Sequence, residues 1–233
     1  AADPRDPEKV AWCHVQLGDA LLNTGKAAEA AREFERALFV FPGYGAALDA
    51  KARARFVAGD LEGALEIYRR EHEAEPSADT ALALGDLYAK LGRADEAARH
   101  YATFESLEPE NAAAENDMHH LVAYWTDHDK NLDEALALAR KERERRKDVY
   151  TCDALAWALY KKGLHAEAKA ASDEALRLGT RDPRLLYHAG MIAYALGERG
   201  RGADYLRRAL AINPAFDVLQ ADVARRTLGG RPA

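Results

Sequence analysis

The sequence predicts an all-α protein, a solenoid of helix–turn–helix repeats. Fifty of its 233 residues are alanine, the best helix former, whereas the β-branched and aromatic residues typical of strands are few. Prolines recur 34 and then 33 residues apart, at Pro42, Pro76 and Pro109. A period of this length indicates repeated helical hairpins, each unable to bury its own apolar face. We therefore expect stacked helical hairpins that share one continuous core.

Composition and charge limit the classes of function. Hydrophobic residues make up 48% of the chain and charged residues 31%, which provides for a core and argues against disorder. The formal net charge is −6, from 33 basic and 39 acidic residues, whereas a general nucleic-acid binder needs a concentrated cationic face. The sequence has no apolar run of about 18 residues, so membrane insertion is not expected.

Each of the three prolines closes the same pattern. An alanine is followed four residues later by an aromatic residue, and the proline comes eight residues after that. A Leu-Gly pair precedes this pattern in two of the repeats. A turn glycine comes seven residues after the glycine of the pair, or after the equivalent position in the other repeats. The members are Ala30, Phe34 and Pro42; Ala64, Tyr68 and Pro76; Ala97, Tyr101 and Pro109; the pairs Leu17-Gly18 and Leu84-Gly85; and the turn glycines Gly25, Gly59, Gly92, Gly163 and Gly197.

This pattern resembles the tetratricopeptide repeat, W-x2-L-G-x2-Y…A-x3-F…P over about 34 residues. The resemblance covers nearly the whole chain and implies a right-handed superhelix of about six repeats between residues 11 and 216. With a C-terminal capping helix this makes about thirteen helices. Residues 1–10 are then a linker or an N-terminal helix extension, 11–216 the repeats, 215–228 a capping helix and 229–233 a tail. The repeats are expected at 11–44, 45–77, 78–111, 115–148, 149–182 and 183–216.

Three repeats depart from the pattern. In the second, Lys51 and Arg55 replace an apolar residue and an aromatic one. The fourth is the most divergent, because it lacks the closing proline and needs one extra residue in the turn before Ala135. The sixth has Gly202 where alanine is usual.

Residue size predicts how each hairpin packs. Small residues such as Gly18 let the first helix approach the second closely, and the aromatic residue of the second helix fills the space between one repeat and the next. Leu17 and Leu21 are expected on the buried stripe of the first helix, because residues four apart lie on one face. Proline is expected to end the second helix, because it cannot continue the hydrogen-bond ladder.

Residues 149–226 also resemble the C-terminal part of bacterial multi-repeat proteins of undefined activity. That resemblance implies further repeats upstream in a longer parent protein. Members often begin with an export signal or a lipoprotein start. The compartment therefore stays open: bacterial cytoplasm, or an exported or periplasmic location if the parent protein carries a signal.

The resemblance implies a non-enzymatic scaffold that binds a peptide or partner protein in a concave groove lined by the first helices. Aromatic residues at groove positions concentrate in the last two repeats, and rigid aromatics beside a methionine are typical of binding hot spots. The expected contact residues are Asp153, Trp157, Tyr160, Tyr187, His188, Met191 and Tyr194, together with Arg53, Asp86 and Lys90 of earlier repeats.

Several alternatives remain open at the level of sequence. The aromatic stripe can be core that packs against neighbouring helices, and Asp153 can bond His188 or a backbone group rather than a ligand. A self-assembling structural array that associates through its exposed ends is the second hypothesis for function. A metal- or small-molecule-binding accessory protein is the third.

No cofactor or metal is expected. Phosphate-binding, zinc-protease and nucleophile-elbow motifs are absent from the sequence. His119, His120 and His128, with Asp117 and Asp127, fit a polar surface on a divergent repeat better than zinc, because His120 and His128 are about two helical turns apart. Cys13 and Cys152 fall in distant repeats and are expected to be small buried hydrophobes rather than a disulfide.

Overall fold

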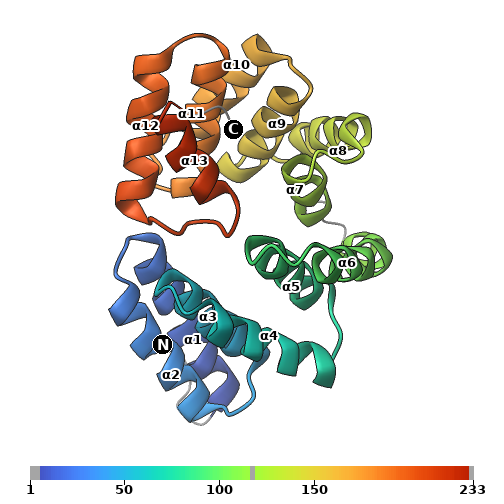
Figure 1. The fold of residues 1–233 in the computed structure, drawn as a ribbon, viewed down its shortest axis with the longest axis vertical. Coiled ribbons are helices and arrows are strands. Elements are labelled where there is room, and N and C mark those ends of the chain that lie inside the picture. The colour runs from blue at the N-terminus through green and yellow to red at the C-terminus, as the bar shows by residue number, and fades with distance from the viewer. Residues whose placement is uncertain (1–5, 116–118, 231–233) are drawn as a thin grey trace. The chain divides into compact units, whose positions relative to one another are not determined.

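The computed structural model describes residues 6–115 and 119–230, with the backbone alone for 109–115. Thirteen α-helices form within these ranges (Figure 1), so the predicted all-α fold is confirmed. The helices are α1 (Pro7–Asn23), α2 (Ala27–Val40), α3 (Gly45–Val57), α4 (Leu61–Ala74), α5 (Ala78–Lys90), α6 (Ala94–Glu115), α7 (His119–Asp127), α8 (Leu132–Arg145), α9 (Val149–Lys161), α10 (His165–Ala175), α11 (Pro183–Ala195), α12 (Arg199–Ile212) and α13 (Gln220–Leu228).

Helices that are consecutive in the chain pack against each other. The packed pairs include α1 with α2, α3 with α4, α7 with α8 and α9 with α10. The first helices of successive hairpins also touch: α1 contacts α3, and α9 contacts both α7 and α11. Sequential hairpins with neighbouring first helices are the arrangement expected of a repeat solenoid.

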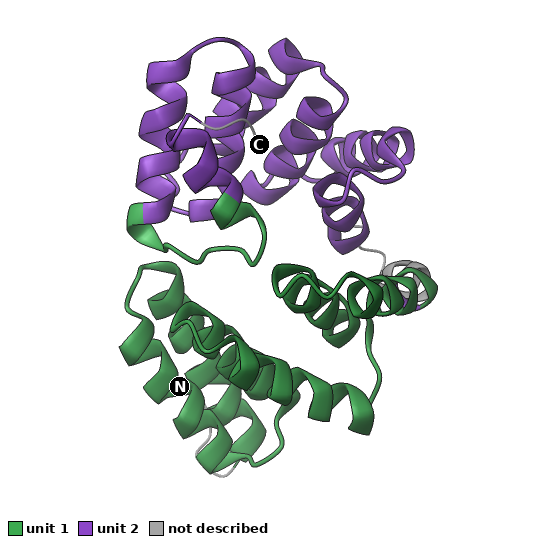
Figure 2. Cartoon of the chain, in the orientation of Figure 1, with its two compact units in different colours: residues 1–106, 211–222 green, residues 107–210, 223–233 purple. Residues whose placement is uncertain are grey.

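The chain divides into two compact units (Figure 2). Unit 1 comprises residues 1–106 and 211–222, and unit 2 comprises residues 107–210 and 223–233. Helices α6, α12 and α13 therefore contribute residues to both units. Each unit has its own buried hydrophobic clusters.

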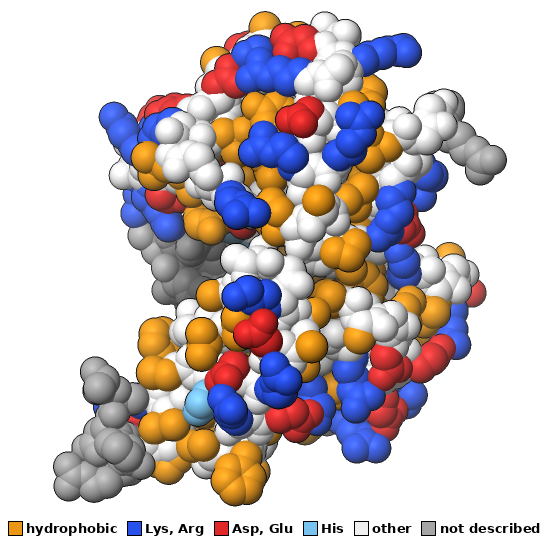
Figure 3. Space-filling view, turned by 90° about the vertical axis from the view of Figure 1, so that its left-hand side faces the viewer, with side chains coloured by type: hydrophobic (Ala, Val, Ile, Leu, Met, Phe, Trp, Pro, Cys, Tyr) orange, Lys and Arg blue, Asp and Glu red, His pale blue; other side chains and the backbone are white. Residues whose placement is uncertain are grey.

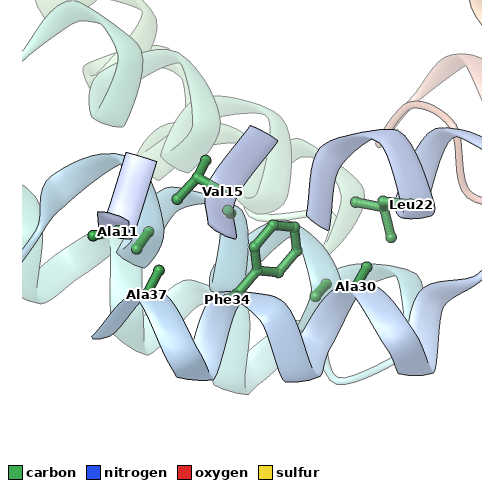
Figure 4. Packing of buried hydrophobic residues seen from close by; sticks show 9 residues of the cluster. Ala11, Val15, Leu22, Ala30, Phe34 and Ala37 are labelled. Carbon is green, nitrogen blue, oxygen red and sulfur yellow. The ribbon is translucent and has the colours of Figure 1, made fainter. Parts of the chain in front are cut away.

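The core of unit 1 begins with small residues packed around one aromatic ring. Phe34 points from α2 toward α1 (Figure 4) and is fully buried. Its ring occupies the space beside Gly18, so a Cβ atom on Gly18 would overlap the ring. Ala11 and Ala37 complete the close approach of the two helices. Tyr101 lies against Gly85 in the same way in the third hairpin. These rings therefore also fill space within a hairpin, in addition to the space between repeats that the sequence predicts.

Polar caps and left-handed residues set the helix ends. Asp60 accepts a hydrogen bond from the backbone N–H of Gly63 at 2.9 Å, and Ser77 forms a capping box with Thr80. All five predicted turn glycines have positive φ, between 73° and 86°. The divergent fourth repeat has no such glycine. Its turn uses Asp129 (φ 53°) and Asn131 (φ 41°), the residue types that best tolerate the left-handed region.

Four expectations about local structure are wrong. Helix α6 continues through Pro109 to Glu115, because a proline removes one backbone donor and the ladder resumes beyond it. The last helix begins at Gln220 rather than at residue 215, and Oδ1 of Asp217 accepts a hydrogen bond from the backbone N–H of Gln220. Leu17 is 50% exposed, since the buried stripe of α1 runs through Ala11, Val15, Gly18 and Leu22. Cys13 is exposed, although Cys152 is buried.

The unusual Gly202 is explained by the packing of α11 on α12 in unit 2. A Cβ atom on Gly202 would lie 2.5 Å from Cδ2 of Tyr194 and 2.9 Å from the carbonyl oxygen of Gly190. Two helix backbones thus approach closely at this point, and the Tyr194 ring fills the space that alanine normally occupies.

We predict that Gly202→Ala destabilises the protein by about 1–3 kcal/mol, because the new methyl group overlaps a backbone oxygen and an aromatic ring. Gly200→Ala is the matched control on the same helix. A Cβ atom there meets nothing within 4 Å, so this variant should be neutral or gain about 0.5 kcal/mol. Urea unfolding measures both, and equal effects of the two substitutions would contradict the packing explanation.

Candidate functional site

The seven expected contact residues of unit 2 lie on two adjacent helices. Asp153, Trp157 and Tyr160 belong to α9, whereas Tyr187, His188, Met191 and Tyr194 belong to α11. Spacings of three and four residues place each set on one face of its helix. Because α9 contacts α11, Tyr187 and His188 meet the α9 set, whereas Met191 contacts Thr227 of α13 and Tyr194 packs on Gly202 of α12.

Trp157 is the centre of this aromatic cluster. Its indole ring stacks on His188, with ring centroids 4.1 Å apart and planes 14° apart, and on Tyr160 at 4.7 Å and 10°. The indole Nε1–H donates a 2.8 Å hydrogen bond to Oδ1 of Asp127, at the end of α7. Only 4% of Trp157 is exposed, so this residue joins three neighbouring first helices instead of lining an open groove.

Asp153 and His188 form a buried polar pair beneath the same ring. Nδ1 of His188 lies 2.8 Å from Oδ2 of Asp153, and both residues are buried. The pairing with His188 is one of the alternatives that the sequence leaves open for Asp153. The other carboxylate oxygen of Asp153 and Nε2 of His188 have no hydrogen-bond partner in the described part of the chain.

The accessible rim of the cluster is charged. Asp127 accepts a second hydrogen bond, 2.8 Å long, from Nη2 of Arg184, whose side chain is 42% exposed. Nζ of Lys161 lies 5.3 Å from the centroid of the Trp157 ring and 2.8 Å from Oδ1 of Asp129. A cation held over an aromatic face is stabilised by the ring quadrupole. The buried network therefore fixes two cations at the surface.

The expected residues differ in their accessibility. Asp153, Trp157, Tyr187, His188 and Met191 are buried, as the core alternative describes. Tyr160 and Tyr194 are partly exposed beside them. Burial, followed by the Asp129 carboxylate, raises the pKa of Tyr160, so its hydroxyl stays neutral at physiological pH.

The other three expected residues lie in unit 1. Arg53 donates from Nη2 to Asp19 and from Nε to Asp49, each at 2.9 Å. Burial lowers the pKa of Arg53, but the carboxylates of Asp49 and Asp19 more than offset it, so the pKa is raised. Asp86 accepts a 2.8 Å hydrogen bond from Tyr101, and Lys90 forms an ion pair with Asp222.

Sequence analysis missed the hydroxyl contacts of the second-helix aromatics. Tyr68 donates to Oδ1 of Asp49 at 2.8 Å, as Tyr101 does to Asp86. Phe34 occupies the same repeat position without a hydroxyl. The choice of tyrosine over phenylalanine was the available signal, because a buried tyrosine hydroxyl usually has a hydrogen-bond partner.

The histidines of the fourth repeat do not converge on a metal position. Among the described residues, no group of three or more His, Cys, Asp or Glu side chains is placed to hold a metal ion, and Asp117 lies outside those residues. The ring of His128 instead lies 4.7 Å from that of Tyr124. A cavity of about 210 Å³ opens between α7, α8 and α9, where its lining includes Glu142, Arg146 and Tyr150.

The surface mixes charges of both signs. On the face in Figure 3, basic and acidic side chains alternate with apolar ones, so this face presents no continuous cationic patch. Within the described residues, none of the helices has the length and apolar character needed to cross a membrane.

Glu71 of α4 is the titratable group of unit 1 that stands out. Its Oε2 atom is buried and has no hydrogen-bond partner among the residues described. Burial, and then the nearby Asp49 carboxylate, raises the pKa of Glu71 from 4.5 to about 7. The folded protein therefore binds this proton more tightly than the unfolded chain does.

We predict that Glu71 makes the free energy of unfolding decrease as the pH rises from about 4.5 through about 7. Protonated Glu71 stabilises the folded state fully only below its ordinary pKa of 4.5, and this stabilisation is lost as the pH rises through the folded-state pKa of about 7. Glu71→Gln should flatten this part of the curve of unfolding free energy against pH, as measured with urea between pH 4.5 and 8. Glu73→Gln, at an exposed position of the same helix, is the control. Parallel curves for Glu71→Gln and the wild type would contradict the prediction.

Comparison with known proteins points to one family. Family models described as tetratricopeptide repeat match residues 15–79, 78–111 and 154–215. The matches leave residues 112–153 uncovered, a stretch that holds the whole of the divergent fourth repeat. A search of curated proteins finds no relative that matches the chain.

Solved structures with similar folds include bacterial repeat proteins. A tetratricopeptide repeat protein from Parabacteroides merdae is 16% identical, with 94% of this chain and 86% of that chain covered and a TM-score of 0.47. PilF of Pseudomonas aeruginosa is 20% identical over 95% and 99% of the two chains, with a TM-score of 0.45. At these identities and scores the neighbours add no argument, and the assignment rests on the family models, which match more than half of the residues. The chain therefore belongs to the tetratricopeptide repeat family.

Proposed function

We propose that the chain is a non-enzymatic scaffold that binds a peptide or partner protein along the faces of its first helices. Tetratricopeptide repeats are generally protein–protein interaction modules. Repeat solenoids use extended surfaces for this purpose, because stacked hairpins align equivalent positions of successive repeats. The proposal places the principal contact area of unit 2 on α9 and α11.

One observation carries this proposal: the Asp127 carboxylate is shared between a buried indole and an exposed guanidinium. Trp157 and Arg184 both donate to Asp127 at 2.8 Å. The buried members of the cluster hold the rim in place, which reduces the entropy lost when a partner binds. Arg184 and Tyr160 then provide the direct contacts, and the buried residues act through them, whereas the ring of Tyr194 packs on Gly202 of α12.

Tyr150 extends this rim to the beginning of α9. It is 52% exposed, and Asp182 and Asp153 are among the charged groups near its hydroxyl. Exposed tyrosine and arginine side chains are the residue types most enriched at binding hot spots.

We predict that a Tyr150→Ala, Arg184→Ala double variant loses partner binding while remaining folded. Affinity capture from a native lysate, quantified by mass spectrometry, should recover the partner at least about tenfold less well, as expected when contact residues contribute 1.4 kcal/mol or more. Circular dichroism verifies that the helices are intact.

An Arg207→Ala, Leu178→Ala double variant is the matched control. It also removes one arginine and one exposed large apolar residue from unit 2, but away from α9 and from the proposed face of α11. Partner recovery should stay at the wild-type level. Equal recovery by the two double variants would remove α9 and α11 from the proposed interface.

A second candidate, self-association through an array end, is favoured by one observation. Leu17 is 50% exposed, whereas Leu84, at the same position of the third repeat, is 1% exposed. Trp12 on the same helix is also 52% exposed. The buried environment of Leu84, in a cluster with Leu65 and Tyr68 of the preceding hairpin, indicates that a helix can cover this position.

If this face joins two copies, the wild type should show a mass that rises with concentration in sedimentation velocity. Leu17→Glu should leave a monomer at every concentration, since burying an unpaired carboxylate is costly. Gln16→Glu adds the same charge at the adjacent exposed position and serves as control. A monomeric wild type would exclude this candidate.

A further inference from the structure

Residues 211–222 run from the last turn of α12 to the first turn of α13 and include Pro214 at the end of the sixth repeat. Residues 211–222 belong to unit 1, together with residues 1–106 (Figure 2). The expected capping helix at 215–228 covers part of this segment, but neither the repeat period nor the family models predict its contacts with residues 1–106. Its contacts within unit 1 therefore need an explanation of their own.

The contacts of this segment with the rest of unit 1 include the following three. The carbonyl oxygen of Ile212 lies so close to Gly25 that a Cβ atom on Gly25 would overlap it. Val218 packs against the buried cluster that contains Leu84, Leu87 and Tyr88. Nζ of Lys90 donates to Oδ2 of Asp222, with both side chains partly buried.

These contacts lie at or just after the C-terminal ends of two first helices, α1 and α5. Gly25 lies in the turn after α1, whereas Tyr88 and Lys90 belong to the last turn of α5. Lys90 is a groove position of the third repeat. The segment thus occupies residues that the repeat architecture makes available to a partner.

The segment has a defined shape of its own. Oδ1 of Asn213 accepts a hydrogen bond from the backbone N–H of Ala215 at 2.9 Å. Oδ1 of Asp217 accepts from Leu219 at 2.9 Å and from Gln220 at 2.8 Å. Such Asx turns restrict the backbone, so little further conformational entropy is lost when Val218 and Asp222 reach unit 1.

We propose that this face of unit 1 is a docking surface and that residues 212–222 are its internal occupant. The matching external partner is a segment in which an Asx turn leads into a helix, with an aliphatic residue four positions before a carboxylate, as in Val218 and Asp222. The inference rests on the proposed function as a partner-binding module, and it specifies the partner class at unit 1. A tethered occupant competes at high effective concentration, so the surface is autoinhibited.

The test uses the full chain and a fluorescein-labelled synthetic peptide with the sequence of residues 212–222. In the Asp222→Lys variant, Lys90 repels the internal segment and remains available to the peptide. This variant should bind the peptide at least about tenfold more tightly than the wild type, as measured by fluorescence anisotropy. Equal Kd values, or no binding to Asp222→Lys, would overturn the proposal.

Charge reversal supplies the matched control. Adding Lys90→Glu to Asp222→Lys restores an opposite-charge pair with the internal segment and repels the peptide carboxylate, so tight peptide binding should disappear. Peptide binding as tight as that of Asp222→Lys alone would show that Lys90 is not the anchor, and would overturn the proposal.

A second measurement does not depend on the peptide. Val218→Ser changes no charge but weakens the apolar contact, so amide hydrogen exchange of residues 213–219 should accelerate in the intact chain. Unchanged exchange in both Val218→Ser and Asp222→Lys would contradict the internal occupancy. The Tyr150→Ala, Arg184→Ala variant should bind the peptide like the wild type, so failure of the α9–α11 interface and failure of this inference are distinguishable.

Discussion

The close approach of two helices within each hairpin is the constraint on which the rest of the structure depends. It requires a residue without a large side chain on the first helix and a ring or branched chain on the second. Gly18 with Phe34, Gly85 with Tyr101, and Gly190 with Leu206 are three solutions to the same packing problem. In the sixth repeat the requirement is met from both sides, since Gly202 also makes room for a ring.

Close packing also decides where polar groups can lie. When the ring is a tyrosine, its hydroxyl reaches a carboxylate of the first helix, as Tyr68 reaches Asp49. Hydroxyl groups of tyrosines on the second helices therefore orient the carboxylates of the first helices. In unit 2 the indole of Trp157 has the same role toward Asp127. The surface chemistry of each unit is thus set by hydrogen bonds that originate in its interior.

The sequence predicts the helical hairpins well, because alanine, aromatic and proline positions encode the packing period directly. The five turn glycines all have the expected positive φ. Burial within the candidate site is less predictable. Groove positions and helix-contact positions share the same spacing of three and four residues, so only the neighbouring side chains decide that Trp157 is buried while Arg184 is accessible. Pro109 illustrates a further limit, because a proline inside a long helix and one that ends a helix have the same local sequence signal.

The unequal burial of the tryptophans gives the molecule an intrinsic optical label. Trp12 of unit 1 is half exposed to water, whereas Trp157 of unit 2 is stacked on an imidazole and a phenol ring and is almost entirely buried. Transfer of Trp157 to solvent changes both the wavelength of its emission and the quenching by its ring neighbours, whereas the surroundings of Trp12 change far less. The third tryptophan, Trp125, is partly buried in α7 of the same unit as Trp157. Tryptophan fluorescence therefore follows mainly the melting of unit 2, while circular dichroism follows the helices of both units.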